Sequence, residues 1–186
     1  MSASFVALAL SYCLGKGTIS LRGQKKRPWL EIKRQETDLT YLNHQLRMLH
    51  KVHDGKLEAV SDIVQGNGFY DDRRIRVHSP DLYRAYELLY FRDERRLTPD
   101  VLQIVGFQGL AALWCDTGVT TKTKAVLRSW TDIPQTQHLA DWAADLGFLP
   151  AKVRKGRLEF QGIYADDLIH DLRQVIPRCK MPTLRR

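Results

Sequence analysis

The sequence is poor in cysteine. Its 186 residues include three cysteines, Cys13, Cys115 and Cys179, and no two of them form a C-x-x-C pair. An odd number of widely spaced cysteines excludes a disulfide framework and is typical of buried or incidental thiols in a reducing compartment. We therefore expect an intracellular protein, either of the cytoplasm or of an organelle matrix.

Long apolar runs are also absent. The first 17 residues, MSASFVALALSYCLGKG, begin without a basic segment, and their apolar stretch is too short to cross a membrane. We expect this stretch to form a buried helix of a soluble protein and not a signal peptide. No membrane partner is expected.

The local motifs of several common enzyme classes are missing. The sequence contains no P-loop, no G-x-S-x-G nucleophile elbow and no dinucleotide-binding glycine pattern. Its six histidines do not have the spacing of a metal cluster, since His44 and His50 lie six residues apart and face differently on one helix. We therefore expect no zinc site.

Acidic residues are in the minority. The chain has 29 lysines and arginines against 21 aspartates and glutamates, which gives a net charge of +8 and a pI of about 9.5. Such an excess favours a polyanionic partner, of which nucleic acid is the commonest. A basic protein without such a partner is the alternative, and net charge alone does not exclude it.

Helical and strand-like segments follow in the same order twice. Apolar periodicity and glycine or proline punctuation predict a helix, a hairpin, a helix, a hairpin and a helix in each half. In the first half these lie at 4–14, 18–36, 38–52, 56–79 and 79–91, with the second hairpin turning at 65–68. In the second half they lie at 107–117, 119–130, 133–148, 149–162 and 164–176.

The repeated order predicts two diverged copies of one α+β unit. We expect the first repeat at residues 1–92, a linker at 93–106 and the second repeat at 107–186. Each repeat begins with an apolar helix that must be covered on all sides, and its copy is the simplest cover. Two such helices side by side bring the turns at Gly17 and Gly118 together.

These segments resemble the LAGLIDADG homing endonucleases in their single-chain, two-repeat form. The likeness is carried by VALALSYCLGKGTISL, by LTPDVLQIVGFQGLAALWCDTG and by the closing IHDLRQVIPRCKMPTLRR, and it covers essentially the whole chain. The resemblance implies an α+β fold of two pseudo-symmetric αββαββα halves. It also implies that two antiparallel sheets form a saddle for DNA, around a central helix pair, in a monomer with an internal pseudo-twofold axis.

The resemblance also implies a metal site, and this sequence departs from it. In the family, the acid immediately before each glycine binds Mg²⁺ against the scissile phosphate. This sequence has Lys16 and Thr117 at those positions. Lysine does not ligate a hard cation, and threonine offers only a neutral hydroxyl. We expect no cofactor, and Mg²⁺ only if nuclease activity is retained.

Asp116 is the remaining candidate catalytic residue. It precedes Thr117, so a helix turns its side chain by about 100° from the family's position. A structural role at the end of the helix is therefore favoured over a shifted metal ligand.

Alternation along the four hairpins predicts a basic face opposite an apolar one. The side chains expected to contact nucleic acid are Arg22, Lys33, Arg74, Arg76, His78, Lys122, Lys124, Arg128, Arg154 and Arg157. Arginine suits guanine edges, and lysine suits phosphates. Solvated edge residues that prevent aggregation are the alternative. A pattern shared by four hairpins favours binding.

The sequence thus predicts a nucleic-acid-binding protein of homing-endonuclease descent, with cleavage impaired or lost, in a repressor, maturase or RNA-assembly role. An active site-specific endonuclease that cleaves double-stranded DNA is the alternative. A structural protein of a ribonucleoprotein assembly is a third hypothesis. Double-stranded DNA and structured RNA both stay open as partners.

Overall fold

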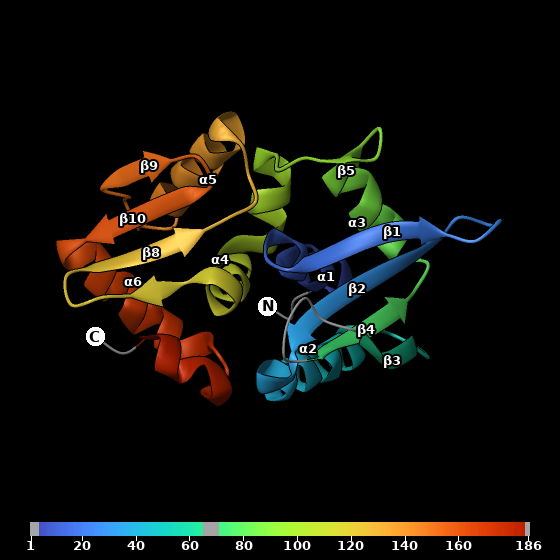
Figure 1. The fold of residues 1–186 in the computed structure, drawn as a ribbon. Coiled ribbons are helices and arrows are strands. Elements are labelled where there is room, and N and C mark those ends of the chain that lie inside the picture. The colour runs from blue at the N-terminus through green and yellow to red at the C-terminus, as the bar shows by residue number, and fades with distance from the viewer. Residues whose placement is uncertain (1–3, 65–70, 185–186) are drawn as a thin grey trace. The chain divides into compact units, whose positions relative to one another are not determined.

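The computed structural model describes residues 4–64 and 71–184 (Figure 1). The chain divides into two compact units, Met1–Leu88 and Leu89–Arg186, here called unit 1 and unit 2. The hairpin turn expected at 65–68 lies outside the described residues. The exact bounds of the two repeats and of their linker stay predictions.

Unit 1 has the predicted order of elements. They are α1 (Phe5–Leu14), β1 (Gly17–Arg22), β2 (Arg27–Gln35), η1 (Glu36–Asp38), α2 (Leu39–Val52), β3 (Glu58–Val64), β4 (Asp72–His78) and α3 (Leu82–Leu89). The buried apolar helix expected over 4–14 is confirmed as α1, in which nine of the ten residues are buried. The hydroxyl of Ser4 caps this helix by accepting a hydrogen bond from the backbone N–H of Ala7 at 3.1 Å.

Unit 2 repeats that order after a short hairpin that the sequence did not predict. Its elements are β5 (Tyr90–Phe91), β6 (Glu94–Arg95), α4 (Pro99–Thr117), β7 (Val119–Thr120), β8 (Lys124–Arg128), α5 (Ile133–Asp145), β9 (Lys152–Arg154), β10 (Arg157–Gln161), α6 (Gly162–Val175) and η2 (Arg178–Leu184). Among the described residues, none of the helices combines the length and apolar character that a bilayer crossing requires.

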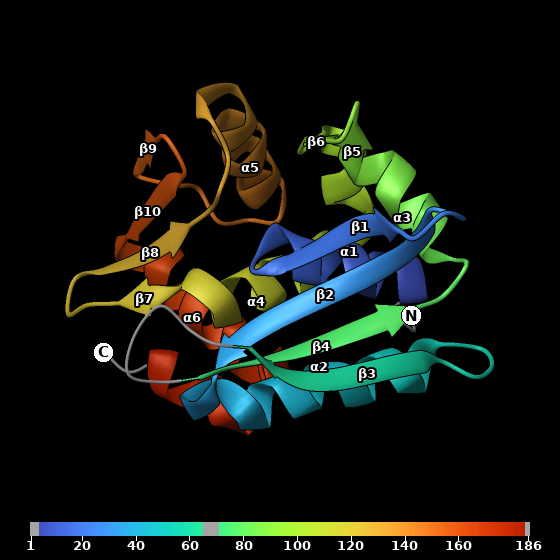
Figure 2. The same ribbon diagram turned by 45° about the vertical axis from the view of Figure 1, so that its right-hand side comes forward.

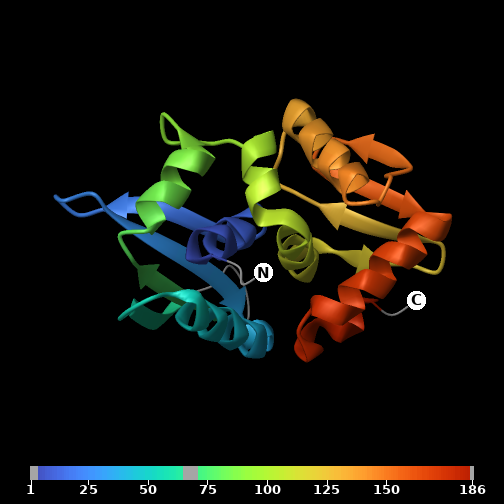
Figure 3. The ribbon, with the colours of Figure 1, turned by 180° about the vertical axis from the view of Figure 1, so that it is seen from behind.

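Each unit contains one antiparallel sheet of four strands. The strand order is β1-β2-β4-β3 in unit 1 and β7-β8-β10-β9 in unit 2, so the two sheets share one topology. Figure 2 shows α1 and α2 behind the sheet of unit 1, and Figure 3 shows α5 and α6 in front of the strands of unit 2 when the molecule is seen from behind. Helices thus cover one face of each sheet, which we call the inner face. The other is the outer face.

Strict alternation places the apolar side chains on the inner face. Leu30 and Val77 are opposite each other on β2 and β4, and both are fully buried. In unit 2, Leu127 and Leu158 occupy the equivalent opposing positions on β8 and β10, and they are equally buried. The side chains between them on each strand must therefore point to the outer face.

One charged residue breaks the apolar pattern of the inner face. Arg34 of β2 is only 2% exposed. Its Nε and one terminal nitrogen donate to Oε1 of Gln45 at 3.3 and 3.2 Å, and its guanidinium lies 5.2 Å from the ring centre of Tyr41. These contacts from α2 compensate for the loss of solvent around the buried charge.

Helix α4 begins earlier than the helix expected at 107–117. Thr98 caps it by accepting a hydrogen bond from the backbone N–H of Val101, and Pro99 occupies the first turn, as the Thr-Pro-Asp sequence predicts. Gly106 then kinks the helix, because its φ of 51° lies in the left-handed region that favours glycine. The second segment of α4 corresponds to the predicted helix.

The glycines that follow α1 and α4 allow close packing. A Cβ atom on Gly17 would lie 2.8 Å from the carbonyl oxygen of Tyr12, and a Cβ atom on Gly118 would overlap the indole of Trp114. Gly118 has an ordinary φ of −72°, so packing and not backbone strain requires glycine there. Trp114 is fully buried and has no room to move aside.

We predict that Gly118→Ala lowers the free energy of unfolding by about 1–3 kcal/mol, because the added methyl group displaces a buried indole. Urea denaturation followed by circular dichroism measures this change. Val119→Ala, at the adjacent and exposed position, is the control and should change stability by less than about 0.5 kcal/mol. Equal stability of Gly118→Ala and the unmodified protein would contradict the packing constraint.

Candidate nucleic-acid interface

The outer face of the sheet in unit 2 is strongly basic. Its lysines and arginines come from three strands, and its only acid among the described strand residues is Glu159. The basic members are Lys124, Arg128, Lys152, Arg154 and Arg157. Exposed charges of one sign on one sheet face produce a positive field over that face.

Three of these arginines lie in a single row across the sheet. Arg157 of β10 is directly opposite Arg128 of β8 on one side and Arg154 of β9 on the other. Like charges at directly opposed positions destabilise a sheet. Within the described part of the chain, neither Arg128 nor Arg154 has an acidic side chain within ion-pair distance, so only the charge of Arg157 is paired directly.

Glu159 compensates part of the positive charge of this face. Its carboxylate contacts Nζ of Lys124 at 3.2 Å and a terminal nitrogen of Arg157 at 2.8 Å. The hydrogen bond from Lys124 and the charges of Arg157 and Arg154 hold the pKa of Glu159 below its ordinary value, although burial alone would raise it. Glu159 is therefore ionised and neutralises one charge of the row.

The helical side of unit 2 has the opposite charge. Helix α5 contains no lysine or arginine and presents Asp141 and Asp145. Helix α6 presents three aspartates, Asp166, Asp167 and Asp171, against the single basic residue Arg173. In unit 2, basic residues thus predominate on the outer face of the sheet, and acidic residues predominate on α5 and α6.

The outer face of unit 1 carries as many basic residues but four acids as well. The basic ones are Arg22, Arg27, Lys33, Arg74 and Arg76, and the acids are Glu31, Glu58, Asp62 and Asp72. Arg22 contacts Glu31 at 2.7 Å, and Lys33 contacts Asp72 at 2.9 Å. Most basic groups of this face are therefore ion-paired within the protein.

Asp62 of β3 is the centre of the ion pairs in unit 1. Arg74 donates to both of its carboxylate oxygens, at 3.0 and 2.5 Å, and Arg76 donates to one of them at 3.2 Å. These bonds, Arg74 foremost, hold the pKa of Asp62 below its ordinary value, against a smaller opposing effect of burial. Another nitrogen of Arg74 lies 3.7 Å from Glu31.

Nine of the ten side chains predicted to contact nucleic acid lie on outer faces. His78 pairs with Trp29 across β4 and β2, where their rings lie 5.3 Å apart, and its Nδ1 is 2.7 Å from the carbonyl oxygen of Pro28. Lys122 is the exception, because it lies in the exposed turn between β7 and β8 and not on a strand.

The sequence did not reveal the acids of these faces. Asp62, Asp72 and Glu159 were not predicted to pair with the basic residues, and Lys152 and Trp29 were not predicted to share their faces. Alternation along KLEAVSDIV does place Asp62 on one face of β3. Its partners, however, lie on β4, and the register between β3 and β4 is not visible in local periodicity.

At the end of α4, Thr117 has a structural contact. Its hydroxyl lies 3.0 Å from the carbonyl oxygen of Leu113 in the helix and 2.6 Å from that of Arg128 at the end of β8. The hydroxyl proton is thus directed to a backbone carbonyl, which joins the helix end to the sheet of unit 2. Asp116 beside it is half-buried.

At the end of α1, Lys16 is exposed within a two-residue turn that leads into β1. Gly15 closes the helix by donating its N–H to the carbonyl oxygen of Tyr12 at 3.2 Å. The turn thus presents a lysine where the family resemblance implies an acid.

Neither a protein-family model nor a curated protein matches the chain. Solved structures do match. The homing endonuclease I-WcaI, solved bound to its DNA recognition sequence, has a TM-score of 0.75 at 15% identity, over 100% of this chain and 88% of its own. I-DmoI in complex with DNA and Mn has a TM-score of 0.59 at 13% identity, over 95% of this chain and 100% of its own.

The complex of I-DmoI with DNA and Ca gives a similar value, a TM-score of 0.58 at 13% identity, over 92% of this chain and 90% of its own. The protein has the LAGLIDADG homing endonuclease fold. The resemblance and the fold class predicted from the sequence are thereby confirmed, while identities this low do not transfer an activity.

The family resemblance assigns Lys16 and Thr117 to the metal-binding positions, and neither side chain suits a divalent cation. A lysine ammonium group has no lone pair to offer a cation, and the neutral Thr117 hydroxyl donates to the backbone carbonyl oxygen of Arg128. Across residues 4–64 and 71–184, no three histidine, cysteine, aspartate or glutamate side chains are grouped to hold a metal ion.

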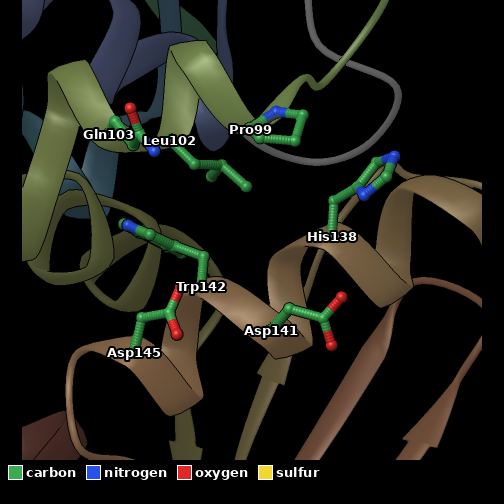
Figure 4. Close-up of a pocket in the computed structure, with 7 residues that line it drawn as sticks. All are labelled: Pro99, Leu102, Gln103, His138, Asp141, Trp142 and Asp145. Carbon is green, nitrogen blue, oxygen red and sulfur yellow. The ribbon is translucent and has the colours of Figure 1, made fainter.

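A pocket of this LAGLIDADG-fold protein lies away from the sheets, between α4 and α5 of unit 2 (Figure 4). It has a volume of about 90 Å³ and is lined by Pro99, Leu102, Gln103, His138, Asp141, Trp142 and Asp145. His138 and the two aspartates do not form a metal-binding group. The pocket is also on the acidic side of unit 2, so it is separate from the basic face.

We predict that Thr117→Val lowers the free energy of unfolding by about 1 kcal/mol, since the valine fills the space but cannot donate to the Arg128 carbonyl. Thr123→Val, an exposed substitution of the same kind in the β7–β8 turn, is the control and should have no measurable effect. Guanidinium denaturation of both variants measures the difference. Equal stability would show that the hydroxyl does not join α4 to β8.

Proposed function

We propose that the protein binds double-stranded nucleic acid through the outer faces of its sheets and has lost metal-dependent cleavage. The observation that carries this proposal is the row of Arg128, Arg157 and Arg154, in which two of the three guanidiniums have no acidic partner among the described residues. A phosphate that contacts these guanidiniums would relieve their mutual repulsion.

The distribution of charge supports a polyanion on the sheet side. A phosphate backbone that approaches unit 2 is attracted by five basic side chains of the outer face and repelled by the aspartates of α5 and α6. Basic residues scattered only for solubility would not require this separation. The charge therefore orients the partner as well as attracting it.

Double-stranded DNA is the partner that the structural neighbours favour. I-WcaI was solved with its DNA recognition sequence, and I-DmoI was solved with DNA and either Mn or Ca. A repressor-like or maturase-like role needs binding without strand cleavage, and both roles are compatible with Lys16 and Thr117 at the helix ends. Structured RNA is the competing partner, and the binding experiment includes it.

The chemistry of the helix ends supports the loss of cleavage. A cation held against a phosphate needs oxygen ligands with negative charge. The lysine at the end of α1 adds positive charge, and the threonine hydroxyl at the end of α4 donates to the backbone carbonyl oxygen of Arg128. Asp116 immediately precedes Thr117 in the chain.

We predict that the double variant Arg128→Ala/Arg154→Ala binds a duplex less tightly and with a weaker salt dependence. Each lost phosphate contact reduces the slope of log K against log salt by about 0.9, so two contacts reduce it by about two. Fluorescence anisotropy at several salt concentrations measures this slope for duplex DNA and, in parallel, for a structured RNA of equal length.

The control is Arg47→Ala/Arg84→Ala, which removes the same charge from exposed positions on α2 and α3. Its slope should equal that of the unmodified protein. Equal slopes for both double variants would contradict the proposed interface. Tighter binding to the RNA than to the duplex would show that RNA, and not DNA, is the preferred partner.

We predict no cleavage when the protein is incubated with a randomised duplex library and Mg²⁺ or Mn²⁺. The reason is that Lys16 and Thr117, and not a pair of carboxylates, occupy the metal-binding positions that the resemblance assigns. Sequencing of the duplex ends detects any cut. Cleavage at a discrete site that disappears in Asp116→Ala would overturn the proposed loss of activity and establish Asp116 as a catalytic residue.

A further inference from the structure

The two sheets share a topology but differ in the charge of one strand. β3 in unit 1 and β9 in unit 2 occupy the same place in their sheets. Each lies at an edge and pairs with the last strand of its unit, β4 or β10. On its outer face β3 presents the acids Glu58 and Asp62, whereas β9 presents Lys152 and Arg154. The same structural position is therefore acidic in one unit and basic in the other.

This difference does not come from the overall charge of the units. From the sequence, unit 1 has 14 basic and 10 acidic residues, and unit 2 has 15 and 11, so both have an excess of four positive charges. What differs is where the acids lie. Unit 1 has four acids on its outer face, and unit 2 has one there and five on α5 and α6.

Asp62 occupies the same donors that a phosphate would use. The Nε and one terminal nitrogen of Arg74 form a two-point contact with its carboxylate, and the other terminal nitrogen of Arg74 faces Glu31. Arg76 directs a terminal nitrogen at the same carboxylate. A carboxylate and a phosphate accept the two-pronged arginine contact in the same way, so they compete for it.

The position of these ion pairs makes the competition effective. The side chains of Arg74, Arg76 and Asp62 are 23%, 28% and 30% exposed, so they are partly shielded from water and salt. Fully exposed pairs yield readily to an approaching anion, and shielded two-point pairs yield less readily. A phosphate must displace Asp62, or approach it and be repelled.

We propose that Asp62 is a built-in competitor for phosphate, which suppresses sequence-independent binding by the sheet of unit 1 and leaves the sheet of unit 2 to supply most of it. This inference rests on the proposed nucleic-acid-binding function. It assigns Asp62 a role in specificity: Arg74 and Arg76 are released only where the bound partner offers contacts that outweigh those to the carboxylate.

The experiment compares Asp62→Asn with Asp54→Asn, using a duplex of random sequence. Both substitutions remove one negative charge. Asp54, however, is exposed just after α2, and no described lysine, arginine or histidine forms an ion pair with it. Asp62→Asn should bind more tightly, with a salt slope steeper by about one to two as one or two arginines reach phosphates. Asp54→Asn should match the unmodified protein.

A double variant tests whether the released arginine carries the effect. Asp62→Asn/Arg74→Ala should lose most of the gain and return towards the slope of the unmodified protein. A gain that persists in the double variant, or an Asp62→Asn protein that binds no more tightly than Asp54→Asn, would overturn the proposal.

Two further measurements keep the result decisive. If circular dichroism shows that Asp62→Asn does not fold, Arg74→Ala is compared with Arg154→Ala in the otherwise unmodified protein. A smaller loss of affinity for Arg74→Ala than for Arg154→Ala supports the proposed role of Asp62. Equal losses overturn it. Failure of the unmodified protein to bind any duplex would overturn this inference and the proposed function together. If Arg128→Ala/Arg154→Ala loses duplex affinity as expected while Asp62→Asn gains none, only the proposed role of Asp62 is overturned.

Discussion

Burial of one face of each four-stranded sheet is the constraint on which the rest of the structure depends. Leu30 and Val77 in unit 1, and Leu127 and Leu158 in unit 2, are removed from water by the helices behind them. Because strand side chains alternate, this burial forces the neighbouring polar residues onto the opposite face. The basic surface is thus a direct consequence of how the apolar residues are placed.

Charges on the outer faces are then decided by strand pairing. In unit 1 the pairing of β3 with β4 brings Asp62 to Arg74 and Arg76, and their attraction neutralises much of the face. In unit 2 the pairing of β9, β10 and β8 aligns three arginines. The same topology with equal net charge therefore yields one balanced face and one positive face.

Packing constrains the turns that follow α1 and α4. Gly17 and Gly118 remain because a side chain at either position would meet Tyr12 or Trp114. The residues before them are not under that constraint, and here they are a lysine and a threonine. Packing therefore accounts for glycine at both helix-to-strand turns, whatever residue precedes it.

The sequence by itself determined the order of elements, the two-fold repetition, the buried helix α1, the Thr98 start of α4 and the LAGLIDADG-like fold, because helix and strand periods and glycine turns are local signals. It did not determine the hairpin β5–β6 or the burial of Arg34. Only the tertiary structure decided which basic groups have acidic partners. Asp62 is 12 and 14 residues from Arg74 and Arg76, and Lys124 is 35 residues from Glu159. Such contacts depend on strand order and register, which local periodicity does not contain.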